Sequence, residues 1–141
     1  GVMSDALAVV RAFIERINAH DVEGLCALMT PDHALVDSLD ATLTGAANMR
    51  AAWETYFLRF PDYRIAAEYF FAMENQVAVF GDASATFAPD GDMRKENFWQ
   101  IPAAWLATMR EGRVAVWRVY ADNQPARSLM QQHAPSKAVN G

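Results

Sequence analysis

The stretch of residues 98–121, FWQIPAAWLATMREGRVAVWRVYA, decides the predicted fold class, because two long apolar runs in it are separated by a turn. Aromatic and β-branched residues are frequent in both runs, and such residues are enriched in strands. Glu111 and Gly112 lie between the runs and are typical of a hairpin turn. We therefore predict strands over residues 98–109 and 114–121, paired as an antiparallel hairpin.

A similar pair of strands precedes this hairpin. Residues 63–73 and 77–87 predict two strands that turn back on each other at Glu74 and Asn75. Pro, Gly and charged residues between the two hairpins predict a loop. The second half of the chain is thus predicted to contain consecutive antiparallel strands.

The first half of the chain has helical spacing instead. Apolar residues recur every three or four positions over residues 7–17 and 49–60, which predicts two amphipathic helices. Ser4 is a candidate N-cap of the first, and an intervening helix is predicted from Asp21 to Pro31.

A short strand over residues 34–39 precedes the third helix. Helices followed by a run of strands predict an α+β fold with an antiparallel sheet. The length of 141 residues is usual for one domain. We expect a single domain over residues 1–141, with an ordered core over about residues 4–123 and a polar tail that frays from Gln124 onward.

The composition excludes several classes of protein. Hydrophobic residues make up 52% of the chain, which predicts a large core, a lined cavity or an oligomer interface. The net charge of −5, without a Lys/Arg cluster, argues against nucleic acid or an anionic membrane as partner. No apolar run is long enough to span a bilayer, and the N-terminus does not look like a signal peptide. Cys26 is the only cysteine, so we expect a cytoplasmic protein without an internal disulfide.

Six short stretches together resemble the nuclear transport factor 2-like superfamily, which includes SnoaL-type polyketide cyclases and ketosteroid isomerases. They are residues 13–25 (FIERINAHDVEGL), 35–37 (LVD), 43–45 (LTG), 60–63 (FPDY), 111–114 (EGRV) and 117–122 (WRVYAD). The resemblance implies a cone-shaped α+β barrel, in which three N-terminal helices pack on a strongly bent, mostly antiparallel sheet around an apolar pocket. It also implies a homodimer formed through the sheet.

Asp37 is the foremost catalytic candidate, because it aligns with the carboxylate that moves a proton in the ketosteroid isomerases that this chain resembles. A carboxylate in an apolar pocket has its charged form disfavoured and becomes a better base near neutral pH. The alternative interpretation is a residue at the end of a strand that faces solvent or accepts a hydrogen bond from a nearby loop amide.

The chain departs from the isomerase pattern at the positions of its acids. Phe13, Trp53 and Trp105 stand where the resemblance places the tyrosines and the second acid that bind the developing oxyanion. Phenylalanine has no donor and an indole has a single N–H. Isomerisation of steroids by the known constellation is therefore not expected.

Epoxide hydrolysis of the limonene type is excluded on similar grounds. Val119 occupies the position of the required acid on the last strand, and the Arg-x-Asp motif is missing around residues 82–87.

Large apolar side chains nevertheless predict a pocket for a small hydrophobic ligand, although each ring alone is equally explained by core packing. The predicted lining residues are Phe13, Ile17, Trp53, Tyr56, Phe57, Tyr69, Trp105, Trp117 and Val119.

Two further aspartates are weaker catalytic candidates. Asp122 shares a strand face with Arg118 and Tyr120, opposite Trp117, so it reaches the pocket only by turning inward at the strand end. Asp82 follows Gly81, where a β-bulge would aim it into the cavity.

Metal and nucleotide cofactors are not expected. The three histidines show no metal-binding spacing, and the chain has no glycine-rich phosphate-binding motif. Three functions stay open: a cofactor-free isomerase, cyclase or dehydratase acting on a hydrophobic carbonyl compound, a non-catalytic ligand-binding protein, and a dimeric interaction module.

Overall fold

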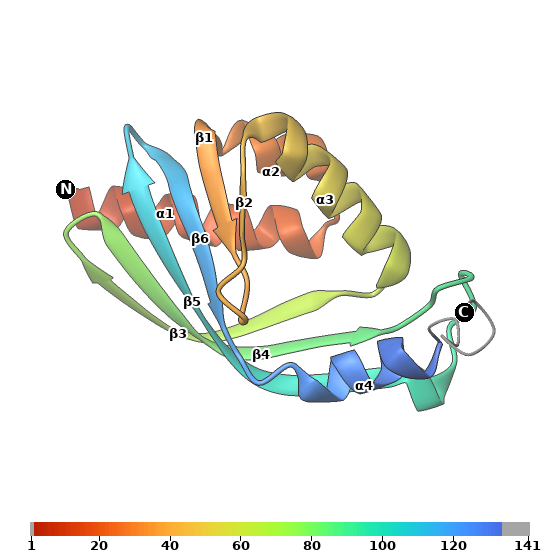
Figure 1. Cartoon of the computed structure of the whole chain (residues 1–141). Helices are drawn as coiled ribbons and strands as arrows, with labels where there is room; N and C mark the ends of the chain where they lie inside the picture. The colour runs from red at the N-terminus through yellow and green to blue at the C-terminus, as the bar shows by residue number, and fades with distance from the viewer. Residues whose placement is uncertain (1, 134–141) are drawn as a thin grey trace.

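The computed structural model describes residues 2–133, with side chains from Asp5 onward. It contains one six-stranded sheet and four α-helices (Figure 1). The helices are α1 (Val2–Asn18), α2 (Val22–Ala27), α3 (Ala46–Arg59) and α4 (Gln124–Gln132), and η1 (Lys95–Asn97) is a short 3-10 helix. The strands are β1 (Met29–Val36), β2 (Thr42–Thr44), β3 (Arg64–Met73), β4 (Gln76–Thr86), β5 (Phe98–Arg110) and β6 (Arg113–Tyr120).

The sheet has the strand order β2-β1-β6-β5-β4-β3. All neighbouring strands are antiparallel except β1 and β6, which are parallel. The sheet is strongly curled, and α1 and α3 lie against its concave side (Figure 1). The predicted α+β class and the bent, mostly antiparallel sheet are confirmed, with a fourth helix in addition.

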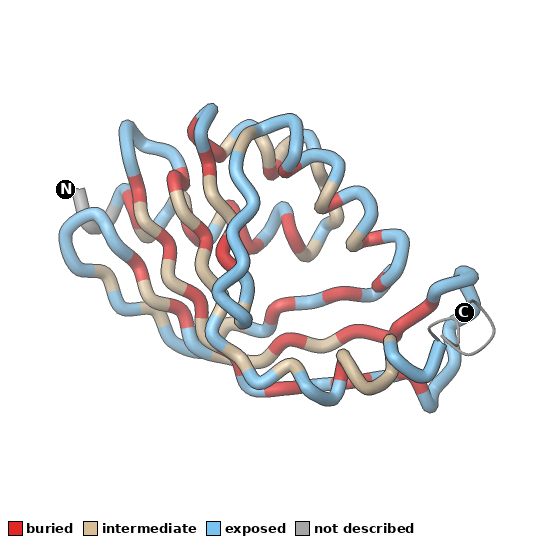
Figure 2. Tube along the Cα trace, in the orientation of Figure 1, coloured by how far each residue is buried: buried red, intermediate tan, exposed pale blue. Residues whose placement is uncertain are grey.

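The two faces of the sheet differ in burial. Along β5, the side chains of Trp99, Ile101 and Trp105 are buried on the concave side, whereas their neighbours in sequence face outward. Figure 2 shows buried positions recurring along the central strands. Because side chains alternate along a strand, this pattern directs three large residues of one strand toward the helices.

A β-bulge changes this alternation in β3. The register against β4 shifts between Ala67 and Tyr69, so that Phe70 packs against the core and Tyr69 faces outward. Gly81 lies opposite the bulge, and a Cβ atom there would stand 2.0 Å from the carbonyl oxygen of Ala66. Only glycine allows the two backbones to approach this closely.

Two predicted boundaries are wrong in the region after α2. Helix α2 ends at Ala27 rather than Pro31, and β1 begins at Met29 rather than residue 34. Pro31 is accepted inside the strand because the pairing of β1 with β6 is irregular between Met29 and Ala34. A proline lacks the N–H of a regular ladder and therefore falls at such irregular positions.

The prediction that the chain frays from Gln124 onward is also wrong, because residues 124–132 form α4. Pro125 occupies the first turn of α4, where the missing N–H costs nothing. Ala126 is buried, and Leu129 and Met130 pack against the core. A single apolar face was thus enough to dock a helix of otherwise polar composition. The predicted tail beyond residue 133 lies outside the described residues.

His33 is a fully buried polar residue that connects β1 to β6. Its Nδ1 lies 2.7 Å from the carbonyl oxygen of Val114. Since a carbonyl only accepts, Nδ1 carries the proton and the neutral ring leaves Nε2 as a bare acceptor. Burial lowers the pKa of His33, and the hydrogen bond to Val114 opposes that shift only in part.

Among the described residues, no helix combines the length and the apolar character needed to cross a bilayer.

Substitution of Gly81 by alanine should destabilise the fold by about 1–3 kcal/mol, because the new methyl group collides with the backbone of β3. Urea unfolding followed by circular dichroism measures the loss. Gly91→Ala measures the cost of a positive φ alone, since Gly91 has a φ of 83° and open space around it. A Gly81→Ala variant as stable as the wild type would contradict the close approach at the bulge.

The stability should also depend on pH through His33. Its pKa is lower in the folded than in the unfolded protein, so its contribution is complete above about pH 6.5 and is lost as the pH falls through the folded value. The free energy of unfolding should therefore fall between pH 7 and pH 5, and fall less steeply in His33→Gln. Equal slopes in the two proteins would contradict this expectation.

Candidate functional site

A cavity of about 310 Å³ lies between α3, β5, β6 and the turn after β1. We call it the inner pocket. Helix α3 contributes Ala52, Trp53 and Tyr56, and the concave faces of β5 and β6 contribute six residues. Its lining residues are Leu35, Asp37, Ser38, Ala52, Trp53, Tyr56, Tyr63, Ala83, Trp99, Ile101, Ala103, Trp105, Trp117, Val119, Ala121 and Asn123.

Three tryptophans line the inner pocket with their rings. The indole N–H groups of Trp53, Trp99 and Trp105 are buried and have no acceptor among the described residues. A buried donor without a partner costs free energy, but these nitrogens have no surface open to the cavity, so a ligand meets the apolar part of the rings.

Two tyrosine hydroxyls are the candidate donors instead. Tyr56 and Tyr63 both line the inner pocket, and their rings meet edge to face at a centroid distance of 5.0 Å. Burial raises the pKa of both hydroxyls well above the ordinary value for tyrosine. Both therefore stay protonated at neutral pH, as donors rather than as bases.

Among the residues that the structure describes, Asp37 is the only carboxylate that lines the inner pocket. Its Oδ1 accepts hydrogen bonds from the backbone N–H groups of Leu39 and Ala41, each at 2.9 Å. Its own N–H donates to the carbonyl of Ala41, which closes the turn between β1 and β2. The residue is exposed at the edge of the cavity rather than enclosed by it.

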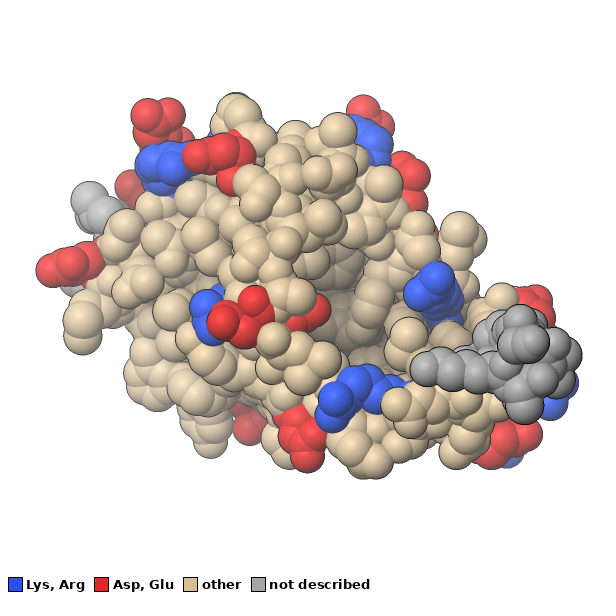
Figure 3. Space-filling view, viewed as in Figure 1, with Lys and Arg blue, Asp and Glu red and all other residues tan. Residues whose placement is uncertain are grey.

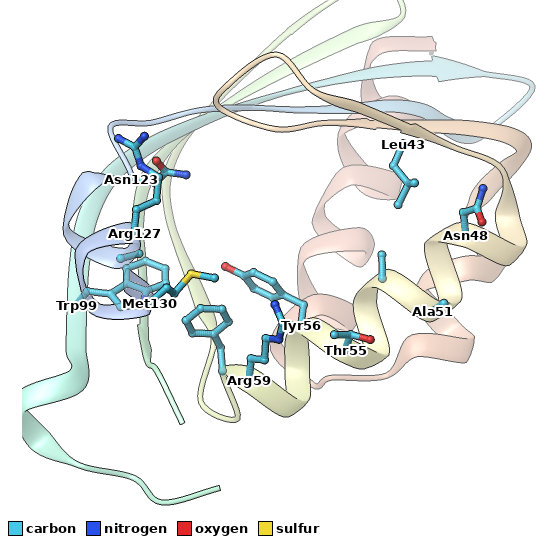
Figure 4. A pocket seen from close by; sticks show the side chains of 13 residues that line it. Leu43, Asn48, Ala51, Thr55, Tyr56, Arg59, Trp99, Asn123, Arg127 and Met130 are labelled. Atoms are coloured by element: carbon cyan, nitrogen blue, oxygen red, sulfur yellow. The ribbon is translucent and has the colours of Figure 1, made fainter. Parts of the chain in front are cut away.

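A second and more open hollow, of about 510 Å³, adjoins the inner pocket between α3 and α4 (Figure 4). We call it the outer hollow. Figure 4 shows Thr55, Tyr56 and Arg59 extending from α3 on one side, with Arg127 and Met130 of α4 on the other. Its remaining lining residues are Leu43, Asn48, Ala51, Ala52, Phe60, Trp99, Asn123 and Ala126. In Figure 3 the hollowed face carries both Lys or Arg and Asp or Glu side chains close to the hollow.

The structure brings five of the nine predicted ligand-binding residues into the inner pocket: Trp53, Tyr56, Trp105, Trp117 and Val119. The other four lie elsewhere. Phe13, Ile17 and Phe57 belong to the closed core, where Phe13 packs on Trp117 at 4.8 Å and Phe57 stacks on His20 at 4.0 Å. Tyr69 is 59% exposed on the outer face of the sheet, as a result of the bulge in β3.

The two weaker aspartate candidates do not line the inner pocket. Asp82 faces outward beside Tyr69 and Phe80, because the bulge lies on β3 and leaves the alternation of β4 unchanged. The Asp122 side chain is 86% exposed and accepts a hydrogen bond from the N–H of Gln124, at the start of α4. Asp37 is therefore the one catalytic candidate at the cavity.

Sequence reasoning missed Tyr63, Trp99 and Asn123 as pocket residues. The signal for Trp99 was present, because it precedes Trp105 by an even number of residues on the same strand. Tyr63 lies between α3 and β3, and Asn123 between β6 and α4, where no periodicity applies. Among residues 2–133, no group of three His, Cys, Asp or Glu side chains is placed to hold a metal ion.

This fold, with a cavity between the curled sheet and the third helix, is of the nuclear transport factor 2-like type. The chain belongs to the SnoaL-like domain family, whose model matches residues 10–117. No curated protein matches the sequence.

Solved structures share the fold at low sequence identity. A candidate SnoaL-like polyketide cyclase from Shewanella denitrificans OS-217 is 16% identical, with a TM-score of 0.77 over 91% of this chain and 98% of the other. An NTF2-like protein from Burkholderia xenovorans LB400 is 20% identical, with a TM-score of 0.72 over 92% and 98%. An LEH-like epoxide hydrolase from M. tuberculosis is 14% identical, with a TM-score of 0.75 over 99% and 98%. These similarities establish the fold alone.

The geometry of Asp37 predicts a structural contribution that is separable from any chemistry. Asp37→Ala should destabilise the protein by about 1 kcal/mol, because two turn amides lose their acceptor. Asp37→Asn retains an oxygen acceptor and should unfold close to the wild-type midpoint. Thermal unfolding followed by circular dichroism compares the three proteins. A midpoint for Asp37→Ala equal to that of the wild type would contradict this role.

Proposed function

We propose that this protein binds a small hydrophobic carbonyl compound in the inner pocket and moves a proton on it without a cofactor. Asp37 is the base, in an isomerase, cyclase or dehydratase type of reaction. The observation that carries the proposal is that one carboxylate and two tyrosines that stay protonated at neutral pH line the same apolar cavity.

The chemical step follows from these groups. The Asp37 carboxylate removes a proton from the carbon next to the carbonyl, and the C–H electron pair forms a carbon–carbon double bond. The carbonyl electrons move to its oxygen, which becomes an enolate that a tyrosine hydroxyl stabilises. Return of the proton to another carbon shifts a double bond, and loss of a neighbouring hydroxyl group as water gives a dehydration.

The arrangement of Asp37 supports such a role. The turn amides of Leu39 and Ala41 both bind Oδ1, and no described residue donates to Oδ2. One oxygen therefore holds the carboxylate in place while the other is available to accept a proton. A base held by neighbouring amides keeps its orientation when a substrate arrives.

The cavity wall supports a flat or polycyclic ligand. Trp105 and Trp117 stack with a centroid distance of 6.3 Å and an angle of 19° between the ring planes. Trp53, Trp99 and Ile101 complete an apolar surface with few polar groups. Such a surface binds hydrophobic molecules, and the few polar groups select their orientation.

A non-catalytic function is the second candidate. The hydrogen bonds of Asp37 to the turn amides also suit a purely structural residue, in which case the pocket would bind a ligand without chemistry.

We also propose a homodimer that forms through the outer face of the sheet, where Tyr69, Phe71, Phe80 and Tyr120 are exposed. Sedimentation over a range of concentrations tests the dimer, and a monomer at all concentrations would exclude it.

Exchange of carbon-bound protons in D₂O separates the catalytic from the non-catalytic function. The probe is 2-tetralone, a bicyclic ketone with acidic protons next to its carbonyl, and the loss of its proton NMR signals reports the exchange rate. Wild-type protein should accelerate the exchange, and Asp37→Asn should lose about 100-fold or more of that acceleration.

Asp40→Asn is the matched control, because Asp40 lies in the same turn, pairs with Arg118 at 2.6 Å and does not line the inner pocket. This control should exchange the ketone at the wild-type rate. Binding of 2-tetralone to the wild-type protein without acceleration would overturn the catalytic proposal and favour the ligand-binding one.

A further inference from the structure

The outer hollow has a charge character opposite to that of the protein as a whole. The chain carries a net charge of −5, yet the described residues that line the hollow include Arg59 and Arg127 and no carboxylate. Most of the other lining groups are apolar or neutral, including Leu43, Ala51 and Met130. The hollow is thus a cationic depression in an anionic protein, which raises the local concentration of anionic ligands.

Neither arginine is neutralised by a close carboxylate. Arg59 takes part in none of the ion pairs among the described residues. Arg127 reaches only Asp122, at 3.9 Å, and that carboxylate is largely exposed. The Nε of Arg127 is buried and lacks an acceptor. The Arg127 side chain as a whole is 41% exposed, so its terminal N–H groups are open to an anionic oxygen of a ligand.

The outer hollow and the inner pocket are parts of one binding region. Ala52, Tyr56, Trp99 and Asn123 line both of them. In Figure 4, Tyr56 extends from α3 toward α4, with Trp99 on the opposite wall. A ligand that passes between Tyr56 and Trp99 therefore contacts both the arginines and the indole-lined cavity.

The charges of the two cavities also favour one orientation of a bound ligand. The inner pocket is lined by one carboxylate, Asp37, and by no Lys or Arg, whereas the outer hollow has the arginines. A negative group on the ligand is repelled from the inner end and attracted to the outer end. An uncharged carbonyl part is then left in the inner pocket, next to the tyrosine hydroxyls.

We propose that the ligand is a hydrophobic carbonyl compound with a carboxylate group, which Arg59 and Arg127 hold in the outer hollow while the ring system occupies the inner pocket. This inference rests on the proposed function and specifies its ligand class. Arg59 lines the hollow from α3 and Arg127 from α4, so the ligand carboxylate enters a hollow with positive charge on both walls. Guanidinium groups suit carboxylates because their planar N–H pairs match the two oxygens.

Calorimetry with two isosteric probes tests the proposal. The probes are 2-naphthoate and 2-naphthamide, which have the same ring system and differ in the charge of one group. Wild-type protein should bind the carboxylate about tenfold or more tightly than the amide, the difference expected for a charge-assisted hydrogen bond. Arg59→Gln and Arg127→Gln should each reduce that preference severalfold and leave the amide affinity unchanged.

Two controls make the result specific. Arg50→Gln removes an exposed arginine from the same helix α3 without touching either cavity, and it should retain the wild-type preference. Raising NaCl from about 20 to about 300 mM should weaken binding of the carboxylate but not of the amide, because salt screens exposed charges.

Equal affinities for the two probes, or a preference that survives both arginine substitutions, would overturn the carboxylate inference. Binding of 2-tetralone distinguishes this failure from failure of the proposed function. If 2-tetralone binds and neither arginine matters for the naphthalene probes, only the carboxylate inference falls. If none of the three compounds binds, the proposed function falls with it.

Discussion

The packing of Trp117 against Phe13 and Trp105 determines which end of the sheet is closed and which end is open. Trp117 contacts Phe13 of α1 at a centroid distance of 4.8 Å and Trp105 at 6.3 Å. These rings fill the space between β5, β6 and α1, where a cavity would cost several kcal/mol. Farther along β5 the inward positions are Ala103, Ile101 and Trp99, and the small side chain of Ala103 leaves room for the inner pocket. The inner pocket therefore begins where the packed rings of Phe13, Trp105 and Trp117 end.

Most of the fold was predictable because its signals are local. The two faces of β6, with Trp117 and Val119 on one and Arg118 and Tyr120 on the other, follow from simple alternation. The sequence did not indicate which of these faces points inward, because both carry apolar residues. Alternation fails in β3, where the bulge between Ala67 and Tyr69 moves Tyr69 to the outer face. Such a bulge depends on a non-local contact, the approach of Gly81 to the backbone of Ala66, and a single strand sequence does not reveal it.

The candidate site was only half predictable for a related reason. Its strand and helix residues recur at regular spacing, but Tyr63 and Asn123 come from connections between elements. One wall of the outer hollow is formed by α4. The polar composition of this helix predicts a tail, because the sequence does not show the surface on which Ala126 and Met130 pack. Tertiary packing overrides such weak local preferences, so the arginine of α4 could not be assigned to a site from sequence alone.

The position of Asp37 shows how a structural and a chemical function are compatible in one side chain. The turn between β1 and β2 needs an acceptor for two amides, and Oδ1 supplies it. This fixes the carboxylate at the edge of the inner pocket, whereas Arg59 and Arg127 line the outer hollow. If the arginines lay beside Asp37, an ion pair would consume the carboxylate and hold it deprotonated with little basicity. Because Asp37 and the two arginines line different cavities, neither charge neutralises the other. The carboxylate of the proposed ligand then interacts with the arginines, while its carbonyl part lies near Asp37.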